Sequence, residues 1–167
     1  IDQKNISKYF NSVYILVKRN NSLIPTDFYN WQLSKPIYDD VGMFIEGLAR
    51  VKKYEKWGYI DKSGNVVVDF KYDETPCFND GFAAVKIGKK WGFIDKKGKI
   101  IIPINYEKVR YYFSEGIIAV KKYGYWGYMN SKNELLIDFK FSDCGSFNND
   151  IALVRNNENN NWGMIKI

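Results

Sequence analysis

The dipeptide Trp-Gly recurs four times in the sequence, and this recurrence constrains the fold more than any other feature. It occurs at Trp57-Gly58, Trp91-Gly92, Trp126-Gly127 and Trp162-Gly163. Successive tryptophans are therefore 34, 35 and 36 residues apart. A near-constant period of this length is typical of chains built from supersecondary units that bury their cores only by stacking on neighbours. We predict a repeat array rather than a domain with one unrepeated topology.

A second frame locates the borders of the units. It consists of a Phe, a Gly three residues later and a Val four residues after that, as in Phe78, Gly81 and Val85. Its other copies start at Phe44, Phe113, Phe147 (with Asp150 in the glycine position) and, in degenerate form, Phe10. An aromatic residue also recurs six residues before the Phe, at Tyr38, Tyr72, Tyr106 and Phe141. The predicted units of a single domain 1–167 are residues 10–43 (degenerate), 44–77, 78–112, 113–146 and a truncated 147–167, with residues 1–9 as an N-terminal cap segment.

Within a unit the periodicity is that of β-strands. Residues 81–87 alternate between apolar and polar, and residues 91–95 and 99–102 form two further short strands around tight turns. The second turn starts at Asp61, Asp95 or Asn130, and the side chains of Asp and Asn can accept hydrogen bonds from the backbone of a turn. The fourth residue of this turn is Gly or Asn, and both tolerate a positive φ. This favours a type I turn with a bulge. We predict an all-β fold of tandem, three-stranded antiparallel meanders in one continuous array, either an open twisted stack, which is our first choice, or a closed propeller-like ring.

The repeated Trp-Gly has a structural interpretation and a functional one. A short three-stranded meander cannot bury both faces alone, so a large indole at the same point of each unit provides an interface to the next unit. The adjacent glycine leaves room for a close approach of another backbone. The alternative is an exposed row of tryptophans that stacks on sugar rings. We favour the structural interpretation, and we expect terminal Trp162 to matter less than Trp91.

Composition excludes several classes of site. The sequence has no histidine, which removes the commonest general base and the imidazole metal ligands. Cys77 and Cys144 are far apart and have no Cys-x-x-Cys spacing, so we interpret them as free thiols, with a disulfide as the alternative. No apolar run is long enough for a transmembrane helix. We therefore expect no catalytic residues, no cofactor, no metal and no membrane insertion. The first residue is Ile1 rather than Met, which suggests a processed or trimmed product.

The strongest candidate for a binding surface is a row of basic residues. The residue after the frame Val is basic in every unit, and the net charge of +6 permits an anionic partner. These residues, which we call the basic row, are Lys18, Lys52, Lys86, Lys121 and Arg155. The alternative is a solvated strand position in which lysine discourages edge aggregation.

Tyrosines and acidic pairs are weaker candidates. Tyr111, Tyr123 and Tyr125 fall near predicted loops, where tyrosine favours recognition of proteins or glycans, although packing between strands is the more frequent role. Carboxylate pairs occur at 39–40 and 73–74 and would suit Ca²⁺ or acid/base chemistry, but nothing predicts that they converge.

The segments Lys-Trp-Gly-Tyr/Phe-Ile-Asp-Lys-x-Gly at 56–64 and 90–98 resemble the WG (KWG) repeat family of bacterial proteins. The resemblance covers about residues 36–167 and is looser at 126–134. It implies a bacterial β-repeat array of a kind usually regarded as an interaction module, and it supplies no catalytic residues. The resemblance does not determine the cellular compartment, and we slightly favour an exported or cell-surface location over the cytoplasm.

We therefore expect a non-enzymatic module that binds another protein, with an acidic face, through the basic row. The alternative is binding of a cell-surface glycan or anionic cell-wall polymer by Tyr and Trp stacking with Lys contacts. Nucleic acid is disfavoured, because acidic residues interrupt the surface and only four of the 25 basic residues are Arg.

Overall fold

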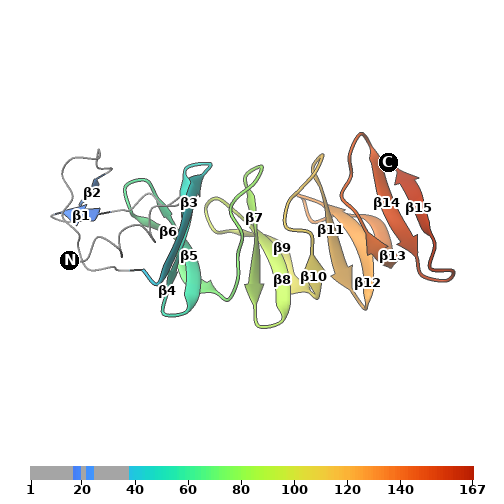
Figure 1. The fold of residues 1–167 in the computed structure, drawn as a ribbon, viewed down its shortest axis with the longest axis horizontal. Helices are drawn as coiled ribbons and strands as arrows, with labels where there is room; N and C mark the ends of the chain where they lie inside the picture. The colour runs from blue at the N-terminus through green and yellow to red at the C-terminus, as the bar shows by residue number, and fades with distance from the viewer. Residues whose placement is uncertain (1–16, 20–21, 25–37) are drawn as a thin grey trace, which may run out of the picture.

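The described part of the chain is an open row of antiparallel β-strands (Figure 1). The computed structural model describes residues 17–19, 22–24 and 38–167. In these ranges all regular elements are strands, and β3–β6 lie at the opposite end of the row from β14 and β15. The all-β prediction and the open stack are confirmed, and the closed ring is wrong. The predicted cap 1–9 and most of the degenerate unit lie outside the described residues.

The strands follow one another along the row in chain order. They are β1 (Val17–Arg19), β2 (Ser22–Ile24), β3 (Asp40–Ile45), β4 (Leu48–Lys53), β5 (Lys56–Asp61), β6 (Val66–Tyr72), β7 (Phe82–Ile87), β8 (Lys90–Asp95), β9 (Ile100–Tyr106), β10 (Lys108–Val109), β11 (Ile117–Lys122), β12 (Tyr125–Asn130), β13 (Leu135–Cys144), β14 (Ile151–Asn156) and β15 (Trp162–Lys166). Every pairing is between strands adjacent in sequence, as in a meander. The sheets are β1–β2, β3–β6, β7–β9 and β10–β15.

The turn after the Trp-Gly strand has the predicted chemistry. In the β8–β9 hairpin, the Gly98 N–H donates to the Asp95 carbonyl at 2.9 Å, which closes a type I turn. The Asp95 carboxylate also accepts hydrogen bonds from the backbone N–H groups of Lys97 and Lys99, both at 2.9 Å. Gly98 has φ +79°, so the left-handed residue that ends this turn is confirmed. The other two units have the same arrangement.

The turn at the frame glycine is a two-residue hairpin. Asn79 and Phe82 exchange both backbone hydrogen bonds, at 2.9 and 3.0 Å, around Asp80 and Gly81. Asp80 has φ 51° and Gly81 has φ 82°, which is the type I′ geometry that matches the twist of the strands. The frame glycine therefore occupies a turn position that requires a positive φ.

The third strand of each unit is longer than predicted, because it stays paired with the Trp-Gly strand across a bulge. The predicted strand 99–102 in fact continues to Tyr106 as β9. Its residues 102–106 lie opposite only residues 91–93 of β8, so β9 bulges where it passes Gly92. After the bulge the chain pairs with the next unit, as when β13 pairs with β12 up to Phe141 and with β14 from Phe141 to Cys144.

Each hydrophobic core lies at a junction between units. The core formed around Trp57 contains Tyr59 and Tyr72 from its own unit and Phe78 and Val85 from the next. Similar cores surround Trp91 and Trp126. Stacking of neighbours, rather than a central core, therefore buries the apolar surface, as expected for a repeat array.

Candidate functional site

The basic row lies directly beside the repeated tryptophans. Four of its members are the cross-strand partners of the four Trp-Gly tryptophans: Lys52 with Trp57, Lys86 with Trp91, Lys121 with Trp126, and Arg155 with Trp162. Such partners project from the same face of a sheet. The Lys86 Nζ lies 5.3 Å from the Trp91 ring centroid, within the range of a cation–π contact. The fifth member, Lys18, pairs with Leu23 through its backbone.

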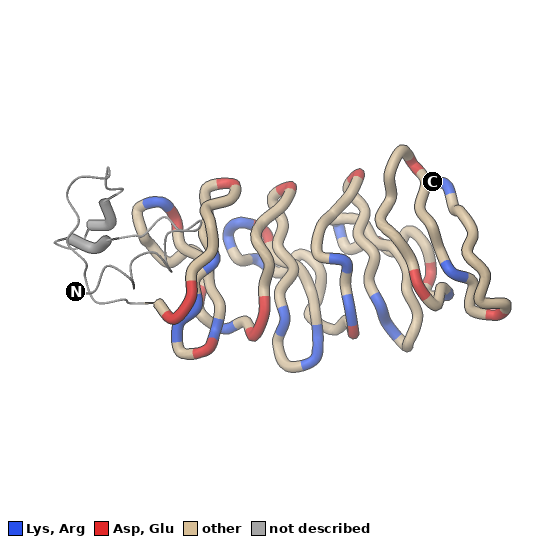
Figure 2. The backbone as a smooth tube through the Cα atoms, viewed as in Figure 1, with Lys and Arg blue, Asp and Glu red and all other residues tan. Residues whose placement is uncertain are grey.

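Each of the four basic residues beside a tryptophan also has a cross-strand partner in the preceding unit. Three of these partners are acidic: Asp40 opposite Lys52, Glu74 opposite Lys86, and Asp143 opposite Arg155. At the fourth position Lys108 lies opposite Lys121. Acidic and basic positions consequently alternate along the array (Figure 2). Three of these four positions in the basic row therefore lie opposite an acidic residue, and one of them, Lys86 with Glu74, forms an ion pair.

Three candidate residues converge on one pocket at the junction between units 78–112 and 113–146. Lys86, Lys121 and Tyr111 line this pocket of about 640 Å³, which we call the junction pocket. Trp91 and Trp126 also line it. Both indoles are buried, so packing fixes the aromatic side of the pocket, beside which the lysine side chains lie.

Tyr111 closes one side of the junction pocket. Its ring packs against Trp91 with centroids 5.2 Å apart, and its hydroxyl donates to the Glu74 carboxylate at 3.3 Å. The Glu74 carboxylate also accepts from the Lys86 ammonium at 3.1 Å. Partial burial, with the nearby Glu74 charge, raises the pKa of Tyr111. Tyr111 is therefore a neutral donor held in place by packing on one side and a carboxylate on the other.

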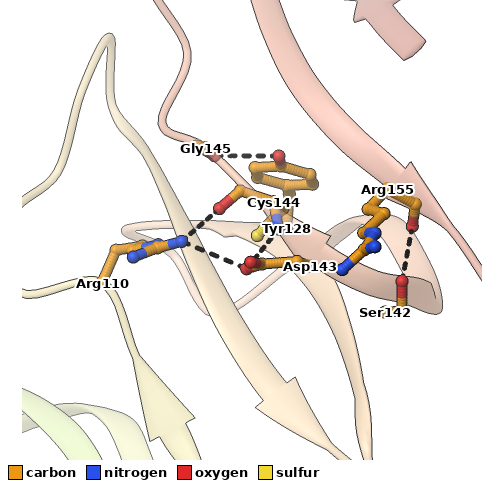
Figure 3. A network of polar contacts seen from close by, with 7 residues as sticks. All are labelled: Arg110, Tyr128, Ser142, Asp143, Cys144, Gly145 and Arg155. Carbon is orange, nitrogen blue, oxygen red and sulfur yellow. Dashed lines mark hydrogen bonds and ion pairs between the residues drawn. The ribbon is translucent and has the colours of Figure 1, made fainter. Parts of the chain in front are cut away.

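Arg110 also lines the junction pocket, and its side chain points toward Asp143 and Cys144 of β13 (Figure 3). Its guanidinium lies 5.2 Å from the Trp126 ring centroid, and it donates to the Asp143 carboxylate at 3.3 Å and to the Cys144 carbonyl. The Arg110 side chain thus donates hydrogen bonds to a carboxylate and a backbone carbonyl and also lies over an aromatic ring. Sequence reasoning missed this residue, because the contacts depend on how the next unit stacks.

Behind the pocket, buried groups fix the connecting segment. The Tyr128 hydroxyl donates to the Gly145 carbonyl at 2.9 Å (Figure 3). Burial raises the pKa of the Cys144 thiol to about 11 and raises the pKa of Tyr128 as well. Both groups are buried, so these shifts follow from packing and do not present a reactive group to a ligand. Cys77 and Cys144 are both free, as interpreted from the sequence.

The remaining tyrosine candidates lie away from the junction pocket. Tyr123 is exposed at the β11–β12 turn, where Lys122 lies over its ring. Tyr125 lines a second pocket of about 570 Å³ together with Phe139 and Ile165. The structure therefore separates these two tyrosines from Tyr111.

Carboxylates also tie neighbouring turns together, which the sequence reasoning missed. The Glu46 carboxylate accepts from the Gly81 N–H of the next unit at 3.0 Å. Glu115 accepts in the same way from Asn149 and Asp150. In the sequence, this contact could have been predicted from the Glu that directly precedes the frame glycine in both units.

No cluster of three or more potential metal-ligating His, Cys, Asp or Glu side chains occurs among residues 38–167 or the two short described strands. That part of the chain also contains no helix long and apolar enough to cross a membrane.

Comparison with known families identifies the repeat. The family described as WG containing repeat matches four times, at residues 32–57, 57–91, 91–126 and 126–162. The chain belongs to the WG-repeat family. No curated protein and no solved structure gives a significant match.

The WG dipeptide of this WG-repeat protein has a steric explanation. Trp57, Trp91 and Trp126 are only 6–9 % exposed, whereas Trp162, which has no following unit in the described row, is 55 % exposed. A Cβ on Gly92 would lie 2.6 Å from the Ile102 carbonyl oxygen of β9. The tryptophan therefore fills the junction while the glycine admits the bulged third strand.

Proposed function

We propose that this WG-repeat protein is a non-catalytic module that binds an acidic face of another protein through its basic row, with the junction pocket at the centre of contact. The observation that carries the proposal is the convergence of Lys86, Lys121 and Tyr111 on one pocket between two units. None of these residues is adjacent in sequence to another, so the stacking of repeats creates the surface.

The chemistry of the junction pocket supports a protein partner. Tyr, Trp and Arg are the residue types most enriched where binding energy concentrates in protein interfaces. Here Tyr111 and Arg110 are held against Trp91 and Trp126, respectively, so both side chains lose less conformational entropy when a partner binds. The charge pairs beside them favour one orientation of a partner whose charges are complementary.

The alternative function is binding of a cell-surface glycan or an anionic cell-wall polymer. The observation that favours it is the exposure of Trp162 and Tyr123, whose rings are open to stacking. The burial of the other three WG tryptophans weakens the alternative, because their faces are not free for a sugar. A neutral saccharide would bind with little salt dependence, whereas an acidic protein would be released as salt screens the lysines.

The test compares three baits in a pull-down from a native bacterial extract. They are the wild type, a triple variant of the basic row (Lys52→Glu, Lys86→Glu and Lys121→Glu), and a control triple variant at exposed hairpin tips (Lys62→Glu, Lys97→Glu and Lys132→Glu). Both variants change the net charge equally, so a difference between them reports position rather than total charge. Circular dichroism checks that all three are folded.

We expect the wild type and the control to capture the same protein, and the row variant to lose it. Capture should fall as salt is raised. Equal capture by all three baits would contradict a role for the basic row. Salt-insensitive retention on a neutral polysaccharide, with quenching of tryptophan fluorescence, would favour the glycan alternative.

A further inference from the structure

We propose that the junction pocket contains a specific binding site for a single carboxylate, between Lys108 and Lys121, which takes a Glu or Asp side chain from the acidic partner. This inference rests on the proposed function and deepens it, because it names the group recognised and the two residues that recognise it. The site arises where the charge pattern of the repeat is broken.

The exception in the pattern lies at this junction. At the other three equivalent positions, the residue opposite the basic row is a carboxylate supplied by the chain itself: Asp40, Glu74 or Asp143. Here the register places Lys108 directly opposite Lys121. Like charges directly opposite one another in a sheet are destabilising. An anion placed between the two ammonium groups would remove this repulsion and supply the carboxylate that the other junctions already have.

The nearby carboxylates are already engaged by other groups. Glu74 forms an ion pair with Lys86 at 3.1 Å, and Asp143 forms one with Arg110 at 3.3 Å. Glu107, the neighbour of Lys108 in sequence, accepts instead from the Gly124 N–H at 3.1 Å. Within residues 38–167, no carboxylate lies within 4.0 Å of the ammonium group of Lys108 or Lys121. The positive charge of the pocket is therefore concentrated on these two lysines.

The surroundings favour a carboxylate on an aliphatic stem over a phosphate. Tyr111, which is 43 % exposed, lines the same pocket and offers apolar contact to the methylene groups of a Glu side chain. The guanidinium of Arg110, which would be the better phosphate ligand, is occupied by Asp143 and the Cys144 carbonyl. The carboxylates of Glu74 and Asp143 flank the pocket and would repel a doubly charged group more than a singly charged one.

The decisive variant is Lys108→Glu, because it restores the charge pattern of the other junctions. The new carboxylate would lie opposite Lys121, as Glu74 lies opposite Lys86. The variant should therefore keep or raise the urea midpoint of unfolding while it blocks the site. Lys97→Glu, at an exposed hairpin tip, changes the net charge equally and serves as the matched control.

The probe is a fluorescein-labelled peptide of ten glutamates, followed by fluorescence anisotropy at low salt. We expect the wild type to bind it, Lys97→Glu to bind within about twofold of the wild type, and Lys108→Glu to bind at least about tenfold more weakly. Lys108→Met and Lys121→Met remove one charge without adding another, and each should weaken binding by a smaller factor. These two variants separate loss of the site from a change in fold caused by Lys108→Glu.

Several outcomes would contradict the proposed carboxylate site. One is the absence of binding by the wild type, and another is equal binding by Lys108→Glu and the wild type. A third is tighter binding of a labelled oligouridylate than of the glutamate peptide, with the same dependence on Lys108, because the ligand would then be nucleic acid.

The pull-down distinguishes failure of the site from failure of the proposed function. If the protein captured by wild type is lost with the triple row variant but retained by Lys108→Glu, the row binds the partner and the carboxylate site is wrong. If the triple variant captures it equally, the proposed function itself is wrong.

Discussion

Replacing Gly92 with alanine tests the explanation of the WG motif most directly. A Cβ at this position would lie 2.6 Å from the Ile102 carbonyl oxygen and 2.8 Å from both the nitrogen and the Cα of Ile104. All three are backbone atoms of β9, so no side chain can rotate away and the strand itself must move. Overpacking of a buried site typically costs about 1–3 kcal/mol. Because the clash is with backbone, we expect about 2–3 kcal/mol.

Gly163 provides a control within the same motif. It follows Trp162, lacks a positive φ, and would place its Cβ with no atom within 4 Å. Gly163→Ala should therefore be neutral or stabilise the protein by about 0.5 kcal/mol, because alanine restricts the unfolded chain. The two substitutions are chemically identical and differ only in whether a third strand passes over the glycine.

The assay is urea unfolding followed by both far-UV circular dichroism and tryptophan fluorescence, because repeat arrays can unfold in parts. For a chain of this size, a loss of 2–3 kcal/mol should also lower the melting temperature by roughly 4–12 °C. Equal effects of Gly92→Ala and Gly163→Ala would refute the steric argument. So would a Gly92→Ala protein as stable as the wild type.

Further predictions follow from the same junctions. Trp91→Ala should cost about 3–5 kcal/mol in urea unfolding, as for other buried aromatics, and Trp162→Ala much less; equal costs would contradict burial as the cause. Tyr128→Phe should cost about 1 kcal/mol, because it removes the hydroxyl that donates to Gly145. Because its pKa is raised to about 11 by burial, Cys144 should remain protonated at pH 8 and react with iodoacetamide only after unfolding. Rapid labelling in the native state, located by mass spectrometry, would contradict this.

The turns and the sheet could be predicted from sequence because their determinants are local. Asp95 accepts hydrogen bonds from residues only two and four positions away, so the type I turn is encoded within one hairpin. The left-handed conformation of Gly98 is likewise a property of that position. The length of β9 was not predictable in this way, because its second half pairs with β8 across a bulge, up to Tyr106 opposite Trp91, and the alternation of residues in β9 does not indicate that bulge.

The candidate site could be predicted from the sequence only in part, because some of its determinants are also not local. The basic row follows from the repeat period, and its position beside the tryptophans follows from hairpin register. The partners of the row come from the preceding unit, and their register depends on the bulge in the third strand. A signal did exist: Asp40, Glu74 and Asp143 each precede their basic partner by 12 residues, and Lys108 occupies the corresponding place 13 residues before Lys121. Recognising it requires knowing that the two positions face each other, and this knowledge comes from the structure.

The pairing between units has a consequence for how such an array changes its length. The chain after each Trp-Gly strand pairs first with its own unit and then with the next: β13 does both, whereas β9 pairs with β8 and the short β10 that follows it pairs with β11. No boundary between units is therefore a natural cutting point, and every position within the period is equivalent as a place to join two copies. Recombination that removes or duplicates one whole period would reproduce the same pattern of backbone pairing at the new junction. An array of this kind can lengthen or shorten in its gene without first evolving a new interface.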